Sequence, residues 1–376
     1  MNKPVKIILG IIIIISFILS FNFNVYAAGN VKFKDAQLEN LIRIMLDKPS
    51  GTLTKSDVEK IKTLDASEKN IKDLGGIENL TELTELNLES NKISDLEALK
   101  NLKSIKILNL KSNDIEDVKF LEKLTNLEEL NLDKNRIELI DCLKELENLQ
   151  NLTMSENIIR SISPLKDLTK IKTLWIDDNK ISDIDSLKDL TKLQILRINN
   201  NVISDIKILS DLVNLQVLRA QANPLSNISS LSKLTKLEML ILAGNQIKDI
   251  KPLEKLTKLN TLSLEHNQIK DISPLASLVN LKNLTLVDND IKDYSPTEIY
   301  YSKLQLKDFE LDEKASNDDK EEACKVDTNK EVKEKEKADN KKDNTNLMLY
   351  GLAGLVVIQL IILGVTIIKK RNEGRD

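Results

Sequence analysis

An asparagine recurs every 22 residues through the middle of this 376-residue chain, and apolar residues keep fixed positions around it. The shared frame is L-x-x-L-x-L-x-x-N-x-I-x-D-I-x-x-L-x-x-L. A unit this short can bury its apolar side chains only by stacking on copies of itself. The sequence therefore predicts an array of similar coils rather than a globular domain. Its ten regularly spaced asparagines, the asparagine ladder, are Asn91, Asn113, Asn135, Asn157, Asn179, Asn201, Asn223, Asn245, Asn267 and Asn289.

The x-L-x-L-x alternation before each ladder asparagine predicts a short strand with two side chains inward and three outward. About ten residues remain in each coil for a turn and a short 3₁₀ segment. Strands of successive coils should be parallel and about 4.8 Å apart, so eleven coils over residues 61–301 would extend roughly 50 Å. We expect each inward Asn to bond backbone groups of its own and the neighbouring coil, because unpaired buried polar groups cost about 1–3 kcal/mol each.

An aspartate column, which includes Asp95, Asp117 and Asp249, lies four residues after the ladder. Capping of exposed backbone N–H groups on the convex turns is the favoured interpretation, and metal binding is the alternative. The single His, the absence of a nucleophile–base pair and the lack of a Gly-rich phosphate loop predict no catalytic residue, no cofactor and no metal. Net charge is −4, and no basic block outside the C-terminal tail suggests nucleic acid.

The segments before the array predict export and a capped N-terminal end. Residues 1–27 combine basic residues, an apolar run and small residues at a cleavage position, which is typical of a secretory signal peptide. An uncleaved membrane anchor is the alternative. Residues 28–60 should form a helical cap, with Asp35 starting one helix and a capping box at Thr54 starting a second that ends near Lys62.

The segments after the array predict a tether. We place the array at residues 61–306, with Leu304 and Leu306 as half a coil, and a charged disordered linker at residues 307–346. Residues 347–368 carry no charge and are long enough to cross a bilayer as a helix. Basic residues follow at once, so residues 369–376 should be a cytoplasmic tail and the repeats extracellular. Cys142 and Cys324 are too isolated to indicate a disulfide framework.

The repeat frame, together with the segment VKFKDAQLENLIRIML and the following LTKSDVEKIKTLDA, resembles the internalins over roughly residues 31–300. This resemblance implies an α/β leucine-rich-repeat solenoid on a Gram-positive cell surface, with strands on a concave face that recognises partner proteins. Two features depart from the family. A charged tail stands where an immunoglobulin-like domain is usual, and no proline follows Pro296, so an LPxTG sorting motif is missing. The chain should therefore be membrane-anchored and not covalently attached to the wall.

Three columns of residues should point outward from the strands. The third column, nearest the ladder, is Glu89, Lys111, Asp133, Ser155, Asp177, Asn199, Gln221, Ala243, Glu265 and Val287. In the other two columns, coils six to nine gather apolar, aromatic and basic side chains where water-facing positions should be polar. This concave patch is Trp175, Ile195, Arg197, Val217, Arg219, Met239 and Ile241.

Two interpretations of the concave patch stand side by side. It is either ordinary strand-favouring sequence or an anchor for a ligand, with a Trp175–Arg197 cation–π contact and acidic residues such as Glu129, Asp133 and Glu156 steering the ligand. We favour a monomeric, membrane-anchored module that binds a protein or peptide ligand on this face. The alternatives are an adhesin for a host receptor, a regulatory scaffold, and a receptor subunit that signals through a partner membrane helix.

Overall fold

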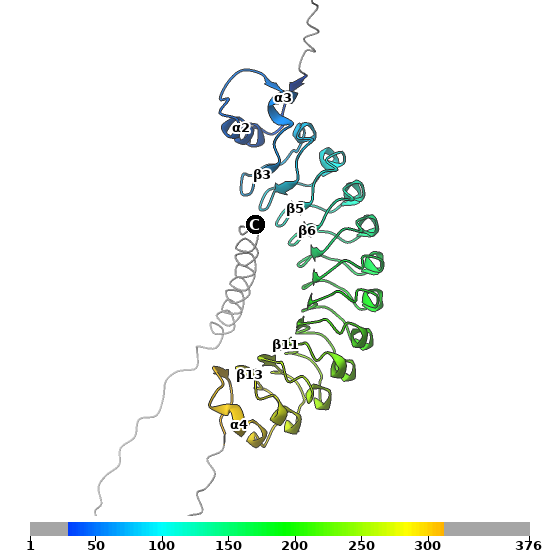
Figure 1. Ribbon diagram of the computed structural model, residues 1–376, viewed down its shortest axis with the longest axis vertical. Coiled ribbons are helices and arrows are strands. Elements are labelled where there is room, and N and C mark those ends of the chain that lie inside the picture. Colours follow the sequence, from blue (N-terminus) through cyan, green and yellow to red (C-terminus); the bar gives the residue numbers. More distant parts are fainter. Residues whose placement is uncertain (1–28, 312–376) are drawn as a thin grey trace, which may run out of the picture. The chain divides into compact units, whose positions relative to one another are not determined.

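The computed structural model describes residues 29–311, in which short coils follow one another along an arc with the strands on its inner side (Figure 1). Twelve parallel strands form one sheet, and their order in space is their order in the sequence. Strands of successive repeats pair residues 22 apart, such as Leu86 with Leu108. The strands are β3 (Thr63–Asp65), β4 (Glu85–Asn87), β5 (Ile107–Asn109), β6 (Glu129–Asn131), β7 (Asn151–Thr153), β8 (Thr173–Trp175), β9 (Ile195–Arg197), β10 (Val217–Arg219), β11 (Met239–Ile241), β12 (Thr261–Ser263), β13 (Asn283–Thr285) and β14 (Leu306–Lys307).

The outer side of the arc consists of short 3₁₀ helices, as the ten-residue return segments predict. A turn after each of them leads back into the next strand, except at the C-terminal end, where α4 follows the last 3₁₀ helix directly. The 3₁₀ helices are η1 (Ile77–Asn79), η2 (Glu97–Leu99), η3 (Lys119–Lys123), η4 (Asp141–Glu145), η5 (Ser163–Leu165), η6 (Asp185–Leu187), η7 (Lys207–Asp211), η8 (Ser229–Lys233), η9 (Lys251–Leu253), η10 (Ser273–Ser277) and η11 (Ser295–Thr297).

The core between the strands and the 3₁₀ helices is one continuous column of Leu and Ile side chains, most of them fully buried. Ladder asparagines line the turn beside it. Asn201 shows the pattern: its Nδ2 donates to the carbonyls of Ile176, Ile198 and Asn199 at 2.9, 3.3 and 3.0 Å, and its Oδ1 accepts from the N–H of Ile181. One side chain thus satisfies backbone groups of its own coil and of the coil before it.

The aspartate column caps the outer turns. Asp95, Asp117 and Asp249 each accept the N–H two residues later, at 2.8–2.9 Å. The same bond recurs where Asn227 replaces Asp. This is the capping role that the sequence predicted, and these carboxylates stand on separate turns rather than converging on one point.

The N-terminal cap closes the first coil. It contains β1 (Asn30–Val31), α2 (Ala36–Met45), β2 (Leu53–Thr54) and α3 (Lys55–Val58), with β1 antiparallel to β2. Asp35 caps α2 and also accepts the N–H of Lys72 at 2.9 Å, which ties the cap to the array. The predicted capping box is present at Thr54, but α3 ends at Val58 instead of near Lys62.

The C-terminal end is closed by aromatic side chains in and around α4 (Glu298–Tyr301). Tyr300 is fully buried, and its hydroxyl donates to the carbonyl of Leu275 at 3.0 Å. Of the two residues expected to form half a coil, Leu304 is buried, whereas Leu306 begins β14 and is 40% exposed. Phe309 fills the core edge instead and stacks on Tyr294 at 4.8 Å between ring centroids. The sheet and core therefore continue past residue 306, the predicted end of the array.

The segments assigned to the signal peptide (1–27), most of the charged linker, the transmembrane helix (347–368) and the cytoplasmic tail (369–376) lie outside the described residues. Between residues 29 and 311, no helix combines the length and the apolar character that crossing a membrane would require.

Candidate functional site

The concave patch occupies four neighbouring strands, β8 to β11, so the sheet brings together all seven residues that the sequence selected. Strand register aligns them in two rows across the strands. The first row consists of Ile195, Val217 and Met239. The second row consists of Trp175, Arg197, Arg219 and Ile241.

None of the seven side chains is fully exposed, and all are half-buried. Parallel strands hold neighbours in a row about 4.8 Å apart, so each large side chain covers part of the next. Ile107, which occupies the same column as Ile195 but near the N-terminal end of the sheet, is 37% exposed. The patch is therefore a packed surface with a partly dry interior, and not a set of separate solvated side chains.

Trp175 and Arg197 form the contact that the sequence predicted. The Arg197 guanidinium carbon lies 4.4 Å from the centroid of the Trp175 ring, within cation–π distance. Arg197 Nη2 also lies 2.5 Å from Oδ2 of Asp177, whose side chain is only 3% exposed. Burial raises the pKa of the Asp177 carboxyl, and the charge of Arg197 opposes that rise.

Asp177 belongs to the third outward column, which the sequence placed on the surface. The structure corrects this placement for the middle of the column, because Asp133, Ser155, Asp177 and Asn199 are at most 8% exposed. Each accepts the backbone N–H of the residue one coil later in the same column. These N–H groups lie just beyond the three-residue strands, so a side chain has to satisfy them. Asp133 is therefore a buried acceptor rather than a steering charge.

Sequence reasoning missed Asp177 as part of the site, although a signal was available. The residue 20 positions before each second-row residue lies in the third column of the preceding coil. Arg197 has Asp177 in that place, and their opposite charges indicate a pair. Trp175 has Ser155 there, and Arg219 has Asn199.

Arg219 differs from Arg197 in having no acidic partner. No hydrogen bond or ion pair joins its guanidinium to any of residues 29–311. Its Nε is buried and unpaired, as are Nε1 of Trp175 and Nε of Arg197 in the same part of the chain. Burial and the neighbouring charge of Arg197 lower the pKa of Arg219, and Asp177 opposes them. The second row thus contains buried N–H donors for which residues 29–311 provide no acceptor.

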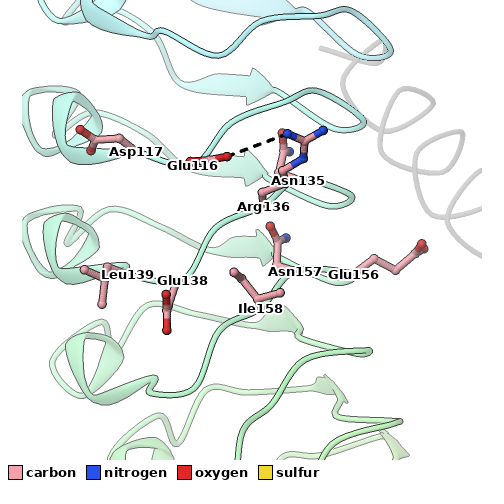
Figure 2. Close-up of a pocket in the computed structure, with 9 residues that line it drawn as sticks. All are labelled: Glu116, Asp117, Asn135, Arg136, Glu138, Leu139, Glu156, Asn157 and Ile158. Atoms are coloured by element: carbon pink, nitrogen blue, oxygen red, sulfur yellow. Dashed lines mark ion pairs between the residues drawn. The ribbon is translucent and has the colours of Figure 1, made fainter.

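A hollow of about 750 Å³ lies elsewhere, on the flank of the array between the ladder turns and the outer turns (Figure 2). Leu139, which replaces an Asp of the capping column, is 71% exposed there. An ion pair between Glu116 and Arg136 crosses one side at 3.9 Å. The hollow is lined by Glu116, Asp117, Asn135, Arg136, Glu138, Leu139, Glu156, Asn157 and Ile158.

Metal chemistry has no evident centre in the described part of the chain. Over residues 29–311, no three His, Cys, Asp or Glu side chains are grouped closely enough to hold an ion. His266 is paired with Asp288 at 2.8 Å on the surface. The buried Cys142 donates from Sγ to the carbonyl of Val118, and burial raises its pKa to about 12. A thiol in that state is a poor nucleophile.

A family model described as leucine rich repeats (2 copies) matches residues 59–101, 103–145, 147–189, 235–277 and 257–297, slightly more than half of the chain. The repeat family typically supplies binding modules rather than enzymes. None of the curated proteins matches the sequence. Among solved structures, a leucine-rich-repeat protein of Leptospira interrogans is 25% identical with a TM-score of 0.57, and the match covers 67% of this chain and 73% of that one.

Two internalins of Listeria monocytogenes are more similar in sequence. Internalin inlF is 32% identical with a TM-score of 0.57, and the match covers 74% of this chain and 96% of inlF. Internalin C2 is also 32% identical, with a TM-score of 0.50 and coverage of 62% of this chain and 94% of that one. The repeats, the coil geometry and these relatives agree, and this chain is an internalin-like member of the leucine-rich-repeat family.

Proposed function

We propose that this protein is a membrane-anchored extracellular module that binds a protein or peptide ligand through the concave patch on β8 to β11. The observation that carries the proposal is the second row, in which an aromatic ring and two guanidinium groups pack together with buried donors left unpaired. Binding hot spots of protein interfaces are enriched in Trp and Arg. Ordinary strand-favouring residues that face water would not account for the burial of Arg219.

One structural neighbour supports a binding role for the repeat array at the level of fold. The leucine-rich-repeat ectodomain of a plant receptor kinase, GASSHO1/SCHENGEN3 from Arabidopsis thaliana, was solved in complex with CASPARIAN STRIP INTEGRITY FACTOR 2. It is 19% identical to this chain, with a TM-score of 0.50, and the match covers 66% of this chain and 38% of that one. A peptide or protein ligand is the class of partner that such an array can accommodate along several coils.

The tether rests on sequence alone. Residues 347–368 are uncharged and are followed by Lys369, Lys370 and Arg371, which favours a single span with the repeats outside. Cell fractionation tests this: the full chain should remain with membranes, and a chain that stops at residue 346 should not. Protease added to intact protoplasts should degrade the repeats, whereas a fully protected array would exclude the proposed orientation.

Binding is tested with the full chain solubilised in detergent and used to capture partners from envelope extracts after mild crosslinking. Ile195→Lys places a charge inside the patch and should abolish capture of any specific partner. The matched control, Ile107→Lys, makes the same change in the same column four coils away and should leave capture unchanged. Equal capture by both variants would exclude the concave patch as the binding site, provided that both retain the native circular dichroism spectrum.

A further inference from the structure

The repeat symmetry of the second row provides an internal comparison between two arginines. Arg197 and Arg219 lie in register on adjacent strands β9 and β10, so their backbones have equivalent surroundings. Arg197 is neutralised by Asp177, whose Oδ2 is 2.5 Å from Nη2. The equivalent place for Arg219 holds Asn199, a neutral amide whose Oδ1 already accepts the N–H of Gln221 at 2.8 Å.

This difference leaves Arg219 half-buried and without a directly paired carboxylate among residues 29–311. Desolvating a guanidinium without a partner is costly, and a carboxylate can offset that cost through two parallel N–H···O bonds. Nε of Arg219 lacks an acceptor within the described chain, and so does Nε1 of Trp175, two strands away in the same row. Arg197 cannot offset the desolvation of Arg219, because its own positive charge lowers the pKa of Arg219 further.

We infer that Arg219 binds a carboxylate of the ligand. This carboxylate would pair with Arg219 as Asp177 pairs with Arg197. A carboxylate is the anion we infer because the equivalent arginine of the preceding coil, Arg197, is paired with the carboxylate of Asp177. The inference rests on the proposed function and specifies the chemistry of the ligand.

The surroundings of Arg219 define what should adjoin that carboxylate. Ile241 is the next residue along the row, and Val217 and Met239 form the parallel row beside it. From Trp175 to Ile241 the row spans three strand spacings, about 14 Å, which is roughly four residues of extended peptide. The occupant is therefore an extended segment of a peptide or protein that carries a carboxylate next to an apolar side chain.

The test uses random heptapeptides as probes and the detergent-solubilised full chain as the receptor. Each library is made with a free C-terminal carboxylate and with a C-terminal amide, which separates main-chain from side-chain carboxylates as the source. Enriched peptides are then resynthesised with each Asp or Glu changed to Asn or Gln, and binding is measured by fluorescence anisotropy. Because Trp175 is the chain's one Trp, its emission reports directly on occupancy of the row.

The expected result is a charge preference that depends on Arg219. Neutralising the carboxylate should weaken binding to the wild type about tenfold or more. In Arg219→Gln the acid peptide and its neutral analogue should bind equally, whereas Arg219→Lys should retain part of the preference. A variant that merely misfolds would lose both peptides together. The control Arg136→Gln, which removes an arginine from the flank, should keep the full preference.

Two outcomes would overturn the inference in different ways. If neutral analogues bind the wild type as well as acid peptides, or if Arg219→Gln keeps the preference, the carboxylate subsite is wrong while docking on the concave patch stands. If no peptide from either library binds the wild type better than it binds Ile195→Lys, docking on the patch fails and the carboxylate subsite fails with it.

Discussion

Removing a ladder asparagine from the middle of the array should destabilise it more than removing one from the end. In Asn201→Ala, the carbonyls of Ile176, Ile198 and Asn199 lose one donor each. All three keep another: Ile176 and Ile198 still accept from the ladder asparagines of the adjacent coils, and Asn199 from a backbone N–H. The N–H of Ile181 loses its acceptor and stays buried.

The magnitude follows from this inventory. One orphaned buried N–H costs about 1–3 kcal/mol, and the three weakened carbonyls add a few tenths each, so the free energy of unfolding should fall by about 3 kcal/mol. Asn289→Ala is the matched control. It removes the equivalent four bonds at the last ladder position, where Asn289 is only half-buried, so that water can enter the space that its side chain leaves. Water can replace the lost bonds there, so the cost should be about 1 kcal/mol.

Urea unfolding of the full chain in detergent measures both variants, followed by far-UV circular dichroism and by the emission of Trp175. Repeat arrays can lose cooperativity when a central coil is weakened, so the two signals should be compared for coincidence. Equal destabilisation by the two substitutions would refute the reasoning, because it would mean that burial does not set the cost of a ladder bond. A loss below about 1 kcal/mol for Asn201→Ala would refute it as well.

Three further predictions concern the ends and the buried groups. Burial raises the Asp177 pKa above 3.8, so the folded state binds protons more tightly than the unfolded state. The wild type should therefore lose stability relative to Asp177→Asn as the pH rises above 3.8 and through the folded-state pKa, and a pH-independent difference in urea midpoints would contradict this. In a Cys324→Ser background, Cys142 should react with a thiol reagent at pH 8 on the order of 10²–10³-fold more slowly than free cysteine until the protein is unfolded, and rapid native labelling would show that the thiol is accessible. Tyr300→Phe should lower the free energy of unfolding by about 1 kcal/mol, since Leu275 keeps a backbone donor; calorimetry showing no change would exclude a contribution from the hydroxyl.

Most of the coil could be predicted because one constraint is repeated many times. The inward Leu and Ile positions have to alternate to form a strand, and the return segment is too short for anything but a 3₁₀ turn. The capping role of the aspartates was predictable for the same reason, since each outer turn exposes the same N–H group. The membership of the concave patch followed from register, because equal coil length places residues 22 apart side by side.

The sequence predicted which way a side chain points from its strand but not how deeply that side chain is buried. Alternation says that Asp133 and Asp177 point away from the core, and the structure shows that outward-pointing side chains at the strand end are still covered. Their burial comes from neighbours in adjacent coils and from the backbone N–H groups that they accept. At the C-terminal end the period no longer holds: β14 pairs with β13 at an offset of 23, and Phe309 instead of Leu306 closes the core.

Because all coils share one backbone, a functional surface in such an array has to be a local departure from its own columns. The flank hollow is one departure, where Leu139 replaces a capping Asp, but its charged side chains Glu116 and Arg136 already have each other. In the second row of the concave patch, the departure leaves the Arg219 guanidinium without a paired carboxylate among the described residues. Asp177 pairs with Arg197, whereas the neutral amide of Asn199 cannot supply a charge to Arg219, and no carboxylate of residues 29–311 pairs with Arg219. That asymmetry between two adjacent, otherwise equivalent coils is why the ligand should dock on the concave side and should do so with a carboxylate.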